Sequence, residues 1–101
     1  MGTAYQFECR ACGYNAHVCG GRDSGMDITV LTSVCGDCRA LVDVVIGRPW
    51  EGGPAATPED LPTLRRCPEC NGENVVPWPR SRPCPKCGEP MEKGDPVTLW
   101  D

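Results

Sequence analysis

Four pairs of cysteines, each with two residues between its members, constrain this chain more than any other feature. They are Cys9/Cys12, Cys35/Cys38, Cys67/Cys70 and Cys84/Cys87, and they take up eight of the nine cysteines. A pair at this spacing presents both sulfurs to one ion from a tight turn, and two such turns complete a tetrahedron, which is the geometry zinc prefers with thiolate ligands. The pattern therefore predicts metal sites.

The composition agrees with a cross-linked scaffold that has little apolar core. In 101 residues the chain carries nine cysteines, eleven prolines and twelve glycines. Disulfides and metal are the two chemistries that could link such a chain. The beginning of the sequence, MGTAYQFECR, has no basic leader or hydrophobic run, and no apolar stretch reaches membrane-spanning length. We therefore expect a cytoplasmic protein with reduced thiols, bound to metal and not to a membrane.

The segment between the second and third cysteine pairs reads RPWEGGPAATPEDLPTL, with four prolines and no periodic apolar pattern. It resembles a linker. The sequence thus predicts three parts, with a first module at residues 1–47, a linker at 48–64 and a second module at 65–101. Each module is too small to be held by an apolar core alone.

Beta-branched residues dominate the arms around the cysteine pairs. In the first module, residues 4–8, 14–18, 26–34 and 39–47 predict short antiparallel strands separated by glycine-rich turns. In the second module, residues 74–78 and 98–101 carry strand-like segments that prolines limit to short edges. No segment has a helical apolar period, so the expected fold class is a small, metal-bound, mainly β protein.

The turns CRACG, CPECNG and CPKCG resemble the knuckles of zinc ribbons and rubredoxin-like domains. In such knuckles the residue after the second cysteine often has a positive φ, which favours glycine or asparagine. Those positions are Gly13, Arg39, Asn71 and Gly88, and three of the four comply. The resemblance covers both modules, and it specifies metal binding more closely than function, because one fold serves many functions.

The resemblance implies two four-cysteine sites, each holding one zinc ion. It implies a first site at Cys9, Cys12, Cys35 and Cys38 and a second site at Cys67, Cys70, Cys84 and Cys87. An interleaved arrangement, in which the first and third pairs share an ion, is an alternative, although local closure costs less entropy. Iron is the alternative metal, because a rubredoxin site uses the same ligands in the same tetrahedron.

Two further residues lie beside the first cysteine pair. His17 is the only histidine, and Cys19 is the unpaired cysteine. On a strand they would share one face. Because four cysteines already saturate a closed structural site, we expect both residues to be bystanders.

Basic residues of the second module suggest a nucleic-acid surface as an alternative function. The second module contains a cluster of basic residues with Trp78 among them: Arg65, Arg66, Arg80, Arg82 and Lys86. A basic patch with an aromatic side chain can hold single-stranded nucleic acid. The competing interpretation is a solvated surface with arginines paired to Glu69, Glu73 and Glu89. The chain has a net charge of −4, and two tetrathiolate sites with divalent ions would bring it to about −8. This charge opposes unspecific attraction to nucleic acid.

Trp50, Trp78 and Trp100 are expected to cover a metal site or an interface between modules. Catalysis finds little support, because a catalytic zinc keeps an open position, whereas four thiolates close the site. The sequence therefore predicts a zinc-binding module that interacts with another protein and is not an enzyme. Nucleic-acid binding and rubredoxin-like electron transfer are the alternatives.

Overall fold

The computed structural model describes residues 2–25, 28–47 and 64–100. Within these ranges the protein is a mainly β structure without a helix, and it contains antiparallel sheets. The strands are β1 (Gly2–Glu8), β2 (Asn15–Val18), β3 (Arg22–Ser24), β4 (Thr29–Cys35), β5 (Ala40–Gly47), β6 (Val75–Pro77) and β7 (Glu92–Trp100). In the described part of the chain, no helix is long and apolar enough to cross a membrane.

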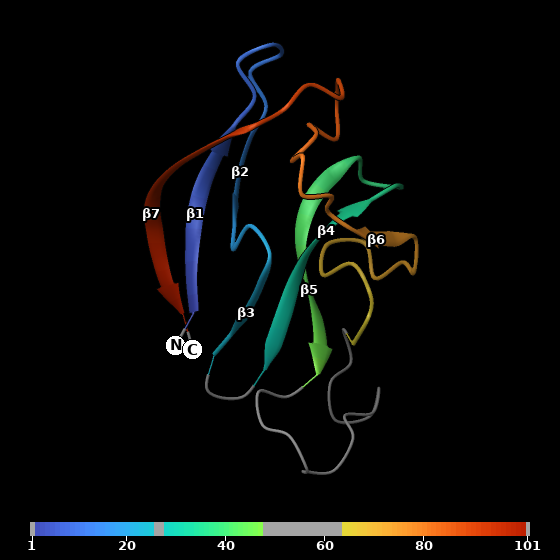
Figure 1. Ribbon diagram of the computed structural model, residues 1–101. Coiled ribbons are helices and arrows are strands. Elements are labelled where there is room, and N and C mark those ends of the chain that lie inside the picture. Colours follow the sequence, from blue (N-terminus) through green and yellow to red (C-terminus); the bar gives the residue numbers. More distant parts are fainter. Residues whose placement is uncertain (1, 26–27, 48–63, 101) are drawn as a thin grey trace.

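The first sheet joins the two ends of the chain. Its strand order is β2-β1-β7, with antiparallel pairing throughout. Figure 1 shows β7 lying along β1, with both termini at the same end of the molecule. Trp100 pairs with Gly2, and its indole covers the place where a side chain at Gly2 would stand. The C-terminal segment therefore belongs to the same sheet as the N-terminal segment.

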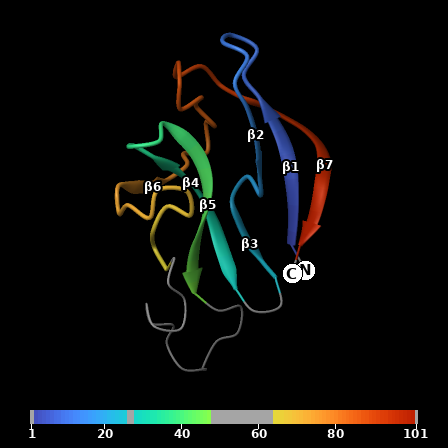
Figure 2. The ribbon, with the colours of Figure 1, turned by 180° about the vertical axis from the view of Figure 1, so that it is seen from behind.

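The second sheet is built around β4. Strand β5 pairs with β4 over its whole length, and the opposite edge of β4 is shared by β3 and β6. Strand β6 pairs with Ser33, Val34 and Cys35 of β4. Figure 2 shows from behind how β6 lies beside β4, away from the β1–β7 pair. Here too a segment after residue 64 completes a sheet that begins before residue 47.

The expectation of two self-contained modules in sequence is wrong. Both sheets contain strands from residues 1–47 and from residues 65–101. The expected linker falls almost wholly outside the described residues. Its last residue, Leu64, forms a bridge with Val45.

The strands themselves mostly follow the sequence pattern, with two exceptions. Strand β3 lies within a glycine-rich cluster for which the sequence predicts a turn, and β7 has nine residues where the sequence predicts a short edge. Strand β7 does contain Pro96, but it lies at the edge of its sheet. An edge position tolerates a residue that lacks a backbone donor.

Two small apolar clusters form the core, and each contains cysteines. The first includes the fully buried Phe7 with Val18, Leu41 and Met91, and it surrounds Cys9 and Cys84. The second packs Val42 and Val44 against Cys35 and Cys67. Neither cluster resembles a large continuous core, so the cysteine groups occupy positions that side-chain packing fills in larger domains.

Candidate metal centres

The eight paired cysteines gather into two groups of four. We call Cys9, Cys12, Cys84 and Cys87 cage one, and Cys35, Cys38, Cys67 and Cys70 cage two. Within each cage all four Sγ atoms lie within 4.8 Å of one another. The first pair thus joins the fourth, and the second joins the third. The expected grouping in sequence order is wrong, and so is the interleaved alternative that joins the first and third pairs.

The physical reason lies in how slowly the entropy of loop closure grows. Cysteines that face each other are 72 and 78 residues apart in cage one and 29 and 35 apart in cage two. Each doubling of loop length adds only about 0.6 kcal/mol, so the nested arrangement costs about 1–2 kcal/mol more than a sequential one. The pairing of β1 with β7 and of β4 with β6 offsets that cost.

All four cysteine turns have the same backbone geometry. In each, the residue after the second cysteine donates its N–H to the carbonyl of the first cysteine, at 2.8 Å. That residue also has a positive φ in every case: Gly13 at 82°, Arg39 at 52°, Asn71 at 59° and Gly88 at 86°. We call these four turns knuckles, at residues 9–13, 35–39, 67–71 and 84–88. Arg39 thus adopts the knuckle conformation despite its side chain.

Backbone amides inside three knuckles point at sulfur. The N–H groups of Cys38, Glu69 and Lys86 each donate to the Sγ of the first cysteine of their knuckle, at 3.4 Å. Hydrogen bonds to the charged form of a group favour that form. The backbone amides of the knuckles therefore favour the thiolate forms of Cys35 and Cys84.

The spacing of the sulfurs fits a tetrahedral metal ion. Four distances between sulfurs of facing knuckles are 3.4 and 3.6 Å in cage one and 3.7 and 3.9 Å in cage two. A tetrahedron with Zn–S bonds of about 2.3 Å has edges of about 3.8 Å. A disulfide would need about 2.05 Å, and all nine cysteines are free. The two cages therefore match the size of a tetrathiolate zinc site.

The charges within cage two favour a bound cation. The amide of Cys38 lowers the pKa of Cys35 to about 7. The pKa of Cys38 is raised to about 12, first through its hydrogen bond with Cys70 and then through that with Cys35. One thiolate thus suppresses the ionisation of its neighbours. A divalent ion removes this conflict by binding all four as thiolates.

Cage one repeats this pattern at Cys84. Burial raises the pKa of its thiol, but hydrogen bonds from the amides of Lys86 and Cys87 lower the pKa. Together with hydrogen bonds from two other cysteines of the cage, they outweigh burial, and the pKa falls to about 7. The first cysteine of each knuckle is buried, whereas Cys12, Cys70 and Cys87 are exposed. The buried cysteines of each cage therefore pack against an apolar cluster, and the other side of the cage faces the surface. Sulfur atoms provide all four potential ligands of each cage.

His17 and Cys19 are not part of either cage. His17 is exposed on β2, where it pairs with Gln6 of β1. Cys19 is partly buried, and its amide donates to the carboxylate of Asp43 at 3.1 and 3.2 Å. Burial, and then the negative charge of Asp43, raise the pKa of the Cys19 thiol to about 12. Both residues therefore lie outside the two cages, as expected from the sequence.

The four candidate nucleic-acid residues differ in their surroundings. Arg66 makes an ion pair with Glu73 at 2.9 Å, and the amide of Arg65 donates to Val45. Arg80 and Arg82 instead border a hollow together with Arg22, a residue that sequence reasoning missed. Nothing in the sequence pattern links Arg22 to the other two, because the tertiary fold alone brings β3 next to residues 78–82.

Two of the three tryptophans fall within the described residues. The ring of Trp78 meets Phe7 edge to face, with centroids 5.1 Å apart, and its Nε1–H donates to the carbonyl of Pro83 at 2.8 Å. Since Phe7 packs with Cys9 and Cys84, Trp78 covers the cluster around cage one. Trp100 packs over Gly2 between β1 and β7. Trp50 lies outside the described residues.

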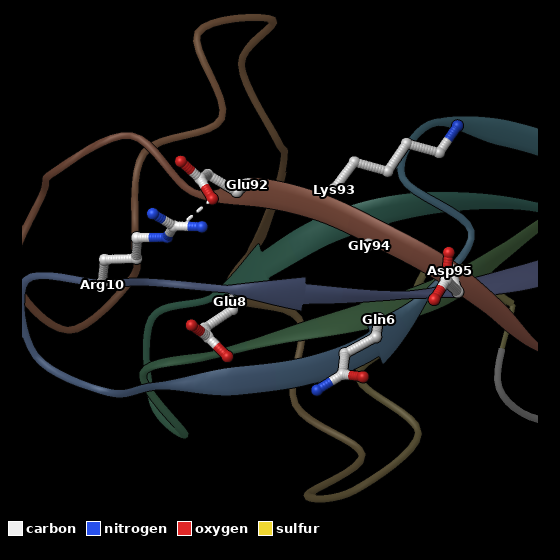
Figure 3. A pocket seen from close by; sticks show the side chains of 7 residues that line it. All are labelled: Gln6, Glu8, Arg10, Glu92, Lys93, Gly94 and Asp95. Carbon is white, nitrogen blue, oxygen red and sulfur yellow. Dashed lines mark ion pairs between the residues drawn. The ribbon is translucent and has the colours of Figure 1, made fainter.

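A polar hollow between β1 and β7 lies near the first knuckle. Figure 3 shows Arg10 reaching Glu92 across the two strands, and their side chains form an ion pair at 2.8 Å. The carboxylates of Glu8, Glu92 and Asp95 stand apart along the strands in this view and do not converge on one point. The ion pair lies at the surface, with side chains 76% and 58% exposed, so it contributes little to stability.

Comparison with known proteins identifies no relative of this chain. No protein-family model, no curated protein and no solved structure matches this chain.

Proposed function

We propose that this chain is a small cytoplasmic zinc protein in which two structural zinc ions hold a scaffold that binds another protein. The observation that carries the proposal is the pair of four-cysteine cages, each with its sulfurs within 4.8 Å of one another. A tetrathiolate site without an open position is typical of structural zinc. Reduced thiols are required for such sites, which supports a cytoplasmic location.

On this proposal the metal ions replace a hydrophobic core. Both core clusters are small and are centred on cysteines. A structural zinc ion contributes about 10 kcal/mol or more to folding. The ions therefore supply the stability that lets the surface serve as an adaptor, and the chain needs no catalytic residues of its own. The resemblance of its knuckles to zinc ribbons and rubredoxin-like domains supports the same interpretation.

Native mass spectrometry of the purified protein tests the metal sites. We expect two zinc ions per chain and a colourless protein. Removing both ions with a chelator is expected to collapse the dispersion of amide proton shifts, because the cages tie β1 to the fourth knuckle and β4 to the third. A red protein with visible charge-transfer absorption would instead identify the metal as iron, bound as in rubredoxin. Retained dispersion after loss of both ions would contradict a structural role.

The adaptor function has a separate test. A tagged chain, purified from its native cells with and without zinc chelation, is expected to retain one protein in stoichiometric amount only when loaded with metal. Nucleic acid recovered in place of a protein, at a yield that falls with added salt, would favour the alternative function.

A further inference from the structure

Three arginines surround one hollow on the side of the molecule where β3 meets the segment after β6. We call it the basic hollow. It encloses about 520 Å³ and is lined by Gly20, Gly21, Arg22, Leu31, Trp78, Pro79, Arg80 and Arg82. No acidic side chain lines it. In a chain of net charge −4, this is a local concentration of positive charge.

The arginines of the basic hollow are not neutralised by carboxylates of the described residues. Among the described residues, two ion pairs form, and their arginines are Arg10 and Arg66, which do not line the hollow. Asp23 adjoins Arg22 in sequence, but its carboxylate accepts the amides of Thr3 at 2.8 Å and Ser24 at 2.9 Å. The guanidinium groups of the hollow therefore keep hydrogen-bond donors that an anion can use.

One buried residue fixes both walls of the hollow. Thr32, which is 1% exposed, donates its amide to Gly21 and accepts the amide of Trp78 at its carbonyl, both at 3.0 Å. Its hydroxyl also accepts the amide of Gly20 at 2.9 Å. The wall formed by Gly20 and Gly21 and the wall formed by Trp78 are thus both hydrogen-bonded to Thr32 of β4.

Aromatic contacts also fix the positions of Trp78 and Arg82. Trp78 is set against Phe7 by the edge-to-face contact, and the guanidinium of Arg82 lies 5.4 Å from the centre of the Phe7 ring. A site whose walls are fixed before a ligand arrives loses less entropy on binding. The basic hollow is therefore preorganised, and it combines positive charge with the apolar surface of Leu31, Trp78 and Pro79.

We infer that the basic hollow binds a short acidic segment of the partner protein, an inference that rests on the adaptor function proposed above. An anionic side chain, either a glutamate or a phosphorylated serine, pairs with Arg22 and Arg80, and an apolar neighbour packs on Trp78. Arginine forms planar, paired hydrogen bonds with both carboxylates and phosphates. A nucleic-acid strand fits less well, because its further phosphates would run over a protein of net negative charge.

The test uses the full-length, zinc-loaded protein and two acetylated hexapeptide amides. One reads Glu-Leu-Glu-Glu-Leu-Glu, and in the other phosphoserine replaces the two central glutamates. Binding is followed through the amide and indole N–H signals in two-dimensional NMR spectra. We expect the indole signal of Trp78 to shift on binding, and the affinity to fall as salt is added. The tighter of the two peptides identifies the source of the negative charge.

Matched variants locate the binding. Arg22→Gln combined with Arg80→Gln removes two exposed arginines of the hollow and is expected to weaken binding about tenfold. Arg10→Gln removes an exposed arginine elsewhere and is expected to change the affinity less than about twofold. Arg82 is kept, because it packs over Phe7. The zinc content and the amide spectrum of each variant verify that it is folded.

Three results of these binding experiments would overturn the inference. These are an absence of binding by both peptides, equal weakening by the Arg10 variant and the double variant, and tighter binding of a ten-nucleotide oligothymidylate that the double variant abolishes. Recovery of the partner protein by the double variant at the native level would also overturn it. That last result leaves the adaptor function standing and moves the contact to another surface.

Discussion

The knuckle residue after the second cysteine must adopt a positive φ. Gly13 and Gly88 meet this requirement without strain, and Asn71 is a residue type that tolerates it. Arg39 adopts a φ of 52° although its side chain disfavours that region. The turn is imposed by the hydrogen bond to Cys35 and by the need to bring two sulfurs to one point, and these outweigh the local preference.

This requirement predicts opposite effects at two positions. Gly13→Ala is expected to destabilise the protein by about 1–2 kcal/mol, and Arg39→Gly to stabilise it by up to about 1 kcal/mol. A Cβ at Gly13 would meet no atom within 4 Å, so the effect comes from the backbone alone. Urea unfolding at a fixed free zinc concentration measures both changes.

Gly21→Ala is the matched control. A Cβ there also meets nothing within 4 Å, and Gly21 has no φ in the left-handed region. We therefore expect it to be close to neutral. Equal destabilisation by Gly13→Ala and Gly21→Ala would contradict the conformational explanation.

Cys19 should react slowly although it is not a ligand. Burial and Asp43 raise the pKa of its thiol to about 12, so at pH 8 the thiolate fraction is about a thousandfold lower than for a thiol of ordinary pKa. We expect iodoacetamide to leave Cys19 almost unmodified in the zinc-loaded protein, and the rate to rise with pH. Mass spectrometry of proteolytic fragments measures the modification, with urea-unfolded, zinc-free protein as the reference. Rapid alkylation at Cys19 in the loaded protein would contradict this.

Among the elements, β4 carries the most connections. One edge of β4 pairs with β5. The other edge pairs with β3 before Thr32 and with β6 after it. The hydroxyl of Thr32 also donates to Asp43 at 2.5 Å, while burial raises the pKa of that carboxyl. A single side chain thus links the glycine loop, β5 and the junction between two strands.

Thr32→Val keeps the shape of the side chain but removes its hydroxyl. It leaves the amide of Gly20 without its partner and removes one of the donors to the carboxylate of Asp43, which keeps the amide of Cys19. We expect a loss of about 1–3 kcal/mol. Thr32→Ser, which retains the hydroxyl, should lose less. The two variants are compared by urea unfolding, and a valine variant as stable as the wild type would refute this role.

Across the molecule, the nested cages join segments that lie far apart in sequence. Cage one ties residues 9–12 to 84–87, and cage two ties 35–38 to 67–70. The chain between residues 47 and 64 is therefore not needed to keep the two parts together. This distinguishes the nested arrangement from a sequential one, in which each part would hold its own metal ion.

Cutting the chain provides a direct test. With a protease site inserted between residues 52 and 53, the cleaved protein is expected to remain a one-to-one complex with two zinc ions. The two fragments should separate only after a chelator is added, because the cages and the two sheets hold them. Native mass spectrometry before and after chelation measures this. Separation into two fragments with one zinc each would support the sequential arrangement.

The local features of the protein follow from its sequence. The spacing within each cysteine pair, with Gly13, Asn71 and Gly88 behind three of them, specifies the knuckles, because a knuckle is made by five consecutive residues. Beta-branched runs likewise predict β4 and β5 to within a few residues. These features depend on neighbours in the chain, so the pattern contains them.

Which knuckles face each other depends on contacts that no local pattern contains. The four knuckles have the same geometry, so nothing within them selects a partner, and the entropy of loop closure changes by only about 1–2 kcal/mol between arrangements. The choice depends on β1 pairing with β7 and β4 with β6, contacts between residues more than thirty positions apart. The same pairings bring Arg22 to Arg80 and Arg82 and so create the basic hollow.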